Sequence, residues 1–176
     1  MNTATFADGL RALPAADRAL LKAMIGGALV ALGLGVGFGA LTALVRAGFI
    51  AIDPEVGYRL MTLHGVTVFF YWLYFGQAAI LLGLAVVHAR RARRLALAPV
   101  AWAGFLLMVA GFGASQVGAW LGAPLLYDGS PEVVGEDRLS AGLFYVGYLF
   151  LGAGLFLLAS AAIATALAGK AEGTTR

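Results

Sequence analysis

Four long stretches without a charged side chain alternate with short charged segments along this chain. No Asp, Glu, Lys or Arg occurs in residues 24–45, 60–87, 99–121 or 139–167. About 20 apolar residues suffice for a helix to cross the roughly 30 Å hydrocarbon core of a bilayer, and every stretch reaches that length. The pattern therefore predicts an all-α integral membrane protein with four transmembrane helices.

The connections between the four stretches are short, so consecutive helices are expected to be antiparallel. The first stretch is longer than the apolar part of a signal peptide and lacks a convincing cleavage pattern, so we interpret it as a retained span. The predicted organisation is an N-terminal arm (1–23), a four-helix transmembrane domain (24–168) and a tail (169–176).

Composition excludes an ordinary soluble domain. Hydrophobic residues make up 61% of the 176 residues and charged residues only 12%, whereas a soluble domain carries roughly 25% charged residues. The chain has no cysteine, which excludes a disulfide, an iron–sulfur cluster or a thiolate metal site within it.

The distribution of cations predicts the orientation in the membrane. Nine of the 12 Lys and Arg residues fall on one side of the predicted spans, and these are Arg11, Arg18, Lys22, Arg90, Arg91, Arg93, Arg94, Lys170 and Arg176. Since short loops rich in Lys and Arg stay in the cytoplasm, both termini are predicted to be cytoplasmic. This rule also explains the arginine cluster between the second and third spans, and no nucleic-acid partner is expected.

Glycines recur in the first predicted span at Gly33, Gly35, Gly37 and Gly39, which gives two overlapping pairs spaced four apart. Small residues at this spacing let transmembrane helices approach closely, so we interpret them as a packing seam. A dinucleotide-binding loop is excluded because no strand precedes these glycines.

One histidine lies inside a predicted span. His64 follows the start of the second charge-free stretch by about one turn, or roughly 6 Å, and ionisable residues at such positions are usually functional. Thr67 and Tyr71 follow it at helical spacing, and an aromatic run surrounds them. An imidazole within an aromatic wall suits axial ligation of haem iron. A histidine bonded to a backbone carbonyl or to another helix, and a proton-path role, are the alternatives.

The second histidine, His88, adjoins the arginine cluster at the other end of the same span and is expected to be solvated. The two histidines are separated by roughly 36 Å along one helix, so they cannot bind the same iron. A six-coordinate haem at His64 therefore needs its second ligand from another chain or another copy.

The segment from Arg46 to Val66 resembles the first two helices of haem–copper oxidase subunit I, and most of all the B-family oxidases. In that family an Arg closes helix I on the outer side, and helix II opens with Thr-x-His-Gly before an aromatic run. Here Thr62-Leu63-His64-Gly65 and Phe69-Phe70-Tyr71-Trp72 fit that pattern.

The resemblance implies that His64 is an axial ligand of a low-spin haem of a or b type. It implies that Arg46 lies near the haem periphery, although an arginine reaching from the interface to water is the alternative. With Thr67 and Tyr71 these residues form the expected cofactor site. Subunit I has twelve or more helices, so the second haem ligand, the copper ligands and the catalytic residues would lie in a partner chain.

The sequence thus predicts the N-terminal four-helix part of a split oxidase subunit I in a bacterial or archaeal cytoplasmic membrane. The chain would pack within a larger helical complex of an aerobic respiratory chain, with other oxidase subunits and membrane lipid as partners. It would have no copper site and no catalysis of its own. The alternatives are a non-catalytic accessory or assembly subunit and a b-type cytochrome anchor with haem between paired His64 residues. The sequence leaves open the electron donor and whether the substrate is oxygen or nitric oxide.

Overall fold

Helices are the only regular secondary structure in the residues that the computed structural model describes, which are 8, 10–88, 94–122 and 138–171. Four helical stretches are long and apolar enough to cross a membrane. The predicted all-α class, with the four helices of a multi-pass membrane protein, is confirmed on these grounds of length and composition.

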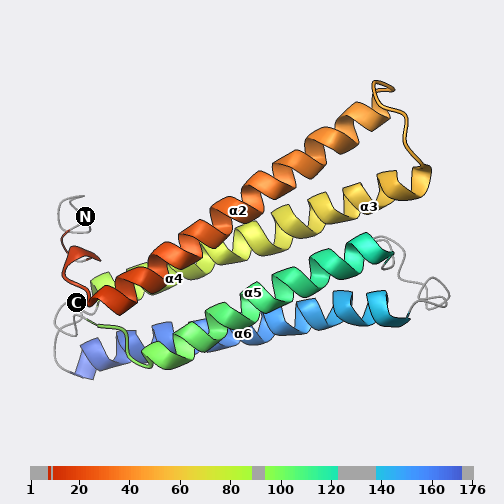
Figure 1. The fold of residues 1–176 in the computed structure, drawn as a ribbon. Helices are drawn as coiled ribbons and strands as arrows, with labels where there is room; N and C mark the ends of the chain where they lie inside the picture. Colours follow the sequence, from red (N-terminus) through yellow and green to blue (C-terminus); the bar gives the residue numbers. More distant parts are fainter. Residues whose placement is uncertain (1–7, 9, 89–93, 123–137, 172–176) are drawn as a thin grey trace.

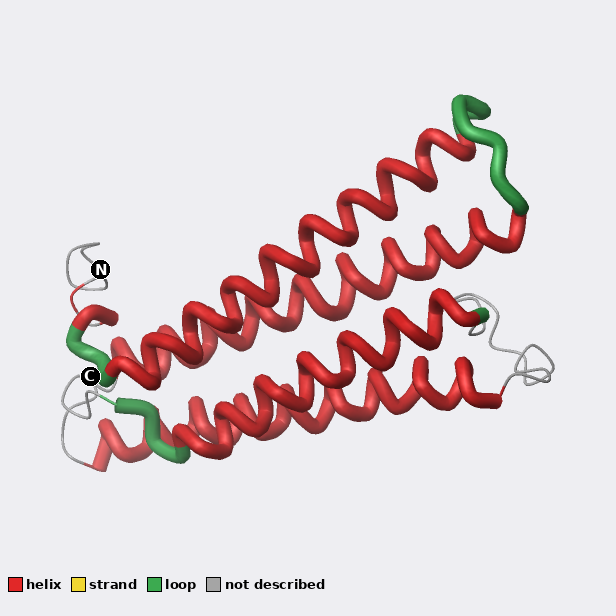
Figure 2. The backbone as a smooth tube through the Cα atoms, in the orientation of Figure 1, coloured by secondary structure: helices red, strands yellow, loops and turns green. Residues whose placement is uncertain are grey.

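The second membrane-crossing helix is the least regular of the four. In chain order the elements are α2 (Ala15–Arg46), α3 (Pro54–Gly65), η1 (Val66–Trp72), α4 (Leu73–His88), α5 (Ala98–Leu121) and α6 (Arg138–Ala171). The segment η1 is π-helical, and α3, η1 and α4 follow one another without a break. Consecutive membrane-crossing helices run in opposite directions, so the start of α2 and the end of α6 lie at the same end of the molecule (Figures 1 and 2).

Local sequence explains where the helices begin and end. The Asp53 carboxylate accepts a hydrogen bond from the Glu55 backbone N–H at 2.8 Å, and Pro54 starts α3 with its fixed φ angle. Helix α5 begins beside Pro99 and ends at Gly122, whose φ of 114° is in the left-handed region that glycine tolerates. These signals place the turns that separate the spans.

Helices α5 and α6 form the closest helix pair, and glycines seven residues apart make it possible. A Cβ atom on Gly111 would lie 2.6 Å from the Gly147 carbonyl oxygen, and one on Gly104 would lie 2.8 Å from the Gly154 oxygen. Without side chains at these positions the two backbones come into direct contact, which is how transmembrane helices gain packing energy in lipid.

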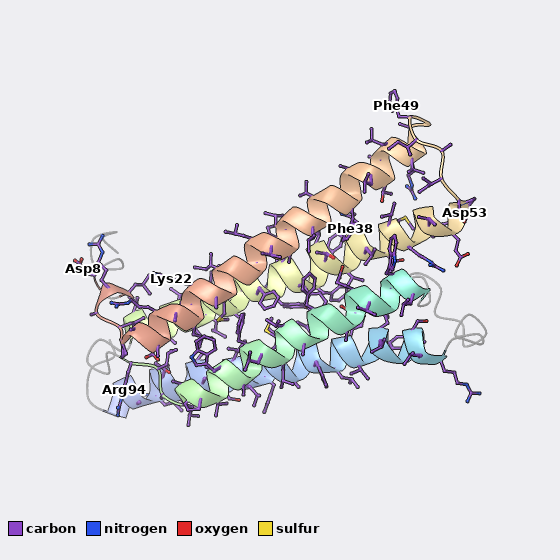
Figure 3. The ribbon with its side chains drawn as sticks, in the orientation of Figure 1. Asp8, Lys22, Phe38, Phe49, Asp53 and Arg94 are labelled. Atoms are coloured by element: carbon purple, nitrogen blue, oxygen red, sulfur yellow. The ribbon has the colours of Figure 1, made fainter. Side chains whose placement is uncertain are left out.

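Two hydrogen bonds tie the segment before α5 to the rest of the bundle. The Asp17 carboxylate, only 4% exposed, accepts from the Leu95 N–H at 2.8 Å, and the Thr165 hydroxyl oxygen accepts from the Ala96 N–H at 3.0 Å. These bonds join α2 and α6 through one short segment. Figure 3 shows Lys22 and Arg94 at this same end and Phe49 and Asp53 at the opposite end.

Candidate functional site

His64 lies in the last turn of α3, with its imidazole ring against α2. Its Nδ1 lies 2.7 Å from the carbonyl oxygen of Gly35. A carbonyl can only accept a hydrogen bond, so Nδ1 is the donor, and in the neutral form of the ring the lone pair is on Nε2. The structure therefore defines which nitrogen of His64 could bind a metal.

The second span fits against α2 because two positions of α2 have no side chain. A Cβ atom on Gly39 would lie 2.7 Å from ring atoms of His64, and one on Gly35 would collide with Val68. A Cβ atom on Gly33 or Gly37, in contrast, would meet no neighbouring atom within 4 Å. Of the two predicted glycine pairs, Gly35 and Gly39 thus pack against the second span, whereas Gly33 and Gly37 face away from it.

Arg46 lies on the same face of α2, seven residues after Gly39. It contributes to a cavity of about 230 Å³ between α2 and α3, together with Thr42, Val45, Pro54, Gly57, Tyr58 and Met61. Its guanidinium donates to the Met61 sulfur at 3.1 Å, and none of the described carboxylates forms an ion pair with it. Arg46 and His64 therefore share one helix–helix seam.

Thr67 and Tyr71 lie elsewhere, in the interior of the bundle, and neither is exposed. The Thr67 hydroxyl donates to Gln116 of α5 at 3.2 Å, while its methyl group lies toward Gly35. The Tyr71 hydroxyl donates to the Gly147 carbonyl of α6 at 3.2 Å. Tyr71 therefore points to α6, away from the α2 face of His64. Thr67 lies between α5 and the Gly35 position of α2, whose carbonyl contacts His64.

The π-helical segment η1 is the physical reason why Tyr71 does not lie on the face that α-helical spacing predicts. It begins at Val66, two residues after His64, and continues through Tyr71. A π-helical turn bonds i to i+5 and holds more residues than an α-helical turn, so the side chains after His64 leave the directions that α-helical spacing predicts. Such segments inside α-helices are frequent at functional sites.

Two groups at the site were not anticipated from the sequence. The Gly35 carbonyl holds His64, and a backbone acceptor has no sequence signal of its own. Gln116 accepts from Thr67, and its amide nitrogen is buried without a partner among the described residues. Gln116 could have been singled out, because it is an amide within a charge-free span.

Other predicted features are only partly within the described residues. The side chain of His88, the cluster positions Arg90, Arg91 and Arg93, and most of the second outer loop lie outside them. Arg59, which has no predicted role, donates to the Trp120 carbonyl at 2.9 Å and pairs with Glu55. Within the described part of the chain no three potential metal ligands come together.

Comparisons with protein-family models, with curated proteins and with solved structures found no match to this chain.

Proposed function

We propose that this chain is the N-terminal four-helix part of a split subunit I of a respiratory haem–copper oxidase. In this proposal His64 supplies one axial ligand to a low-spin haem that is shared with a partner chain. The partner supplies the remaining subunit I helices, the second axial ligand and the oxygen-reducing centre. The chain lies in a bacterial or archaeal cytoplasmic membrane with both termini in the cytoplasm.

The observation that supports this proposal most is the hydrogen bond between His64 Nδ1 and the Gly35 carbonyl. Metal-ligating histidines usually donate their other ring N–H to a carbonyl, a carboxylate or water, which orients the ring and raises its basicity. A proton on Nδ1 leaves Nε2 as the iron-binding nitrogen. His64 is therefore suited in tautomer and chemistry to haem ligation.

Each residue of the seam would have a separate task. His64 would bind the iron, Gly35 would hold the ring in position, and Gly39 would leave room for it. Arg46 would interact with negatively charged or carbonyl groups at the edge of the macrocycle. When bound, a low-spin haem supplies one-electron transfer, and the protein tunes it through the axial ligand and its hydrogen bond.

Thr67 and Tyr71 would have a different task from the residues of the seam. They form hydrogen bonds inside the bundle and are fully buried, so they would act as interior supports of the second span rather than as haem contacts. A single ligand from this chain cannot make a six-coordinate haem, which is why the proposal requires a partner.

A non-catalytic accessory or assembly subunit is the second candidate, and the same hydrogen bond favours it. A histidine bonded to a backbone carbonyl of a neighbouring helix is already satisfied as a packing residue, and intramembrane polar side chains commonly bond across helices. At His64, the two candidates differ in whether Nε2 binds iron.

The proposal is tested by measuring haem in two preparations. The chain purified alone should contain far less than one haem per chain. The complex isolated from its native membrane should contain a second polypeptide with the missing helices and a low-spin haem. A stoichiometric six-coordinate haem in the isolated monomer would contradict the shared site. A native complex without haem would favour the accessory subunit.

A further inference from the structure

Gln77 is a polar side chain on the outer surface of a membrane-crossing helix. It lies on α4 near the middle of the charge-free stretch 60–87, about 16 Å of helix away from His88. Its side chain is exposed, and no hydrogen bond joins its amide to another described residue. In a membrane-embedded chain without a partner at this surface, the amide would face the hydrocarbon core.

An unpaired amide at this depth is unfavourable. Hydrocarbon offers no hydrogen bonds, so polar groups in the bilayer core either face a partner or carry a desolvation cost of several kcal/mol. A lipid acyl chain cannot satisfy Gln77. An occupant of the surface around it must therefore provide both a donor and an acceptor.

The surface around Gln77 is a groove between α4 and α6. It has a volume of about 470 Å³ and is lined by Tyr74, Gln77, Ala78, Ile80, Leu81, Leu84, Leu155, Leu158 and Ala159. A further hollow of about 350 Å³ shares Leu81 and Leu84 with it and extends to Ala166. Several of the lining side chains are alanines, which allow another helix to approach closely.

Gln77 also belongs to a regular seam on α4. Leu73, Gln77, Ile80 and Leu84 are spaced by four, three and four residues, and all are exposed. This is the spacing by which two packed helices interlock, and one polar residue within such a seam can set register and oligomeric state. The seam therefore fits a second helix packed along α4.

We propose that a second copy of this chain docks on the α4 seam, so that the Gln77 amides of the two copies hydrogen-bond to each other. A two-fold axis along the membrane normal brings identical residues together at the same depth. A glutamine amide has both donor and acceptor, so it is electrostatically complementary to its own copy. Each α4 would then lie beside the α4–α6 groove of the partner copy.

The α4 seam is separate from the proposed haem site. His64 contacts α2, whereas the seam borders the groove with α6. A dimer through α4 therefore does not occupy the α2–α3 seam that carries His64 and Arg46. For the same reason it would not be the haem-bridged dimer of a b-type cytochrome anchor.

The test measures self-association of the full chain in bilayers at decreasing protein-to-lipid ratio. Single-molecule photobleaching counts the copies in each complex. Gln77→Leu should weaken the dimer about tenfold, since interhelical hydrogen bonds of this kind contribute about 1–2 kcal/mol. Gln77→Asn keeps an amide and should retain most of the association. Leu29→Ala, on the exposed face of α2, is the matched control and should change nothing.

Cysteine cross-linking gives a second measurement, because the chain has no cysteine. Ile80→Cys should form an intermolecular disulfide in the bilayer, and Leu29→Cys should not. A monomer at every lipid ratio, a dimer insensitive to Gln77→Leu, or cross-linking of Ile80→Cys only to a different polypeptide would overturn the proposal.

Discussion

Two single residues, both glycines, determine where the His64 ring can lie. Gly35 supplies the carbonyl that holds Nδ1, and Gly39 supplies the space beside the ring. Sequence alone identified His64 as the unusual residue, because it is the ionisable group within a span. It could not identify the Gly35 carbonyl, because every residue carries one and only tertiary packing selects among them.

Gly39→Ala is expected to destabilise the protein, because its methyl group would lie 2.7 Å from the His64 ring. Overpacking of a filled site costs about 1–3 kcal/mol, and we expect a loss in that range in the free energy of unfolding. The measurement is reversible unfolding in mixed micelles. Gly37→Ala is the control, since open space surrounds that position, and its stability should be unchanged or slightly higher. Equal losses for both variants would contradict the assigned seam.

Among the helices, the charge-free stretches predicted the existence of all four membrane-crossing elements. The π-helical segment η1 was not predictable in the same way, because hydrophobic periodicity assumes one regular helix throughout. The directions of two predicted site residues therefore differ from those of a regular helix. Thr67 bonds to α5 and Tyr71 bonds to α6. The glycines spaced by seven in α5 are visible in the sequence, but their facing residues on α6 depend on the packing.

Gly111→Ala is expected to separate α5 from α6, because the added methyl group meets the Gly147 carbonyl at 2.6 Å and backbone cannot yield locally. The expected loss in the free energy of unfolding is about 1–3 kcal/mol. Gly113→Ala lies on the same helix in open space, and it should instead gain up to about 1 kcal/mol from better helix propensity. The pair is compared by the same unfolding measurement, and a gain for Gly111→Ala would contradict the close contact.

At the scale of the whole molecule, both proposals require other polypeptides to complete them. In the proposed haem site His64 would supply one ligand, and Gln77 has an amide without a partner among the described residues. The Gln77 amide is costly for an isolated chain in a bilayer, and a six-coordinate haem at His64 would need a second ligand from another polypeptide. The fold class followed from sequence because lipid imposes helices of a set length, whereas the identity of the partners depends on surfaces that no periodicity encodes.

Orientation is also a property of the whole molecule and has its own test. Cysteines introduced at Asn2 and Thr175 should resist an impermeant thiol reagent in intact cells, because the excess of Lys and Arg near the termini predicts that both are cytoplasmic. A cysteine at Phe49, which is 81% exposed at the opposite end, should react. Labelling at either terminus but not at Phe49 would show that the topology is the reverse of the predicted one.

Binding of haem iron by His64 is best tested by the reduced-minus-oxidised spectrum of the assembled complex carrying His64→Ala. The low-spin band should disappear, because alanine provides neither the ligand nor the hydrogen bond that orients it. His88→Ala is the control and should keep the full band, since a ligand there would place the haem at the opposite side of the membrane. A full low-spin band in His64→Ala, with assembly unimpaired, would contradict haem ligation by this residue.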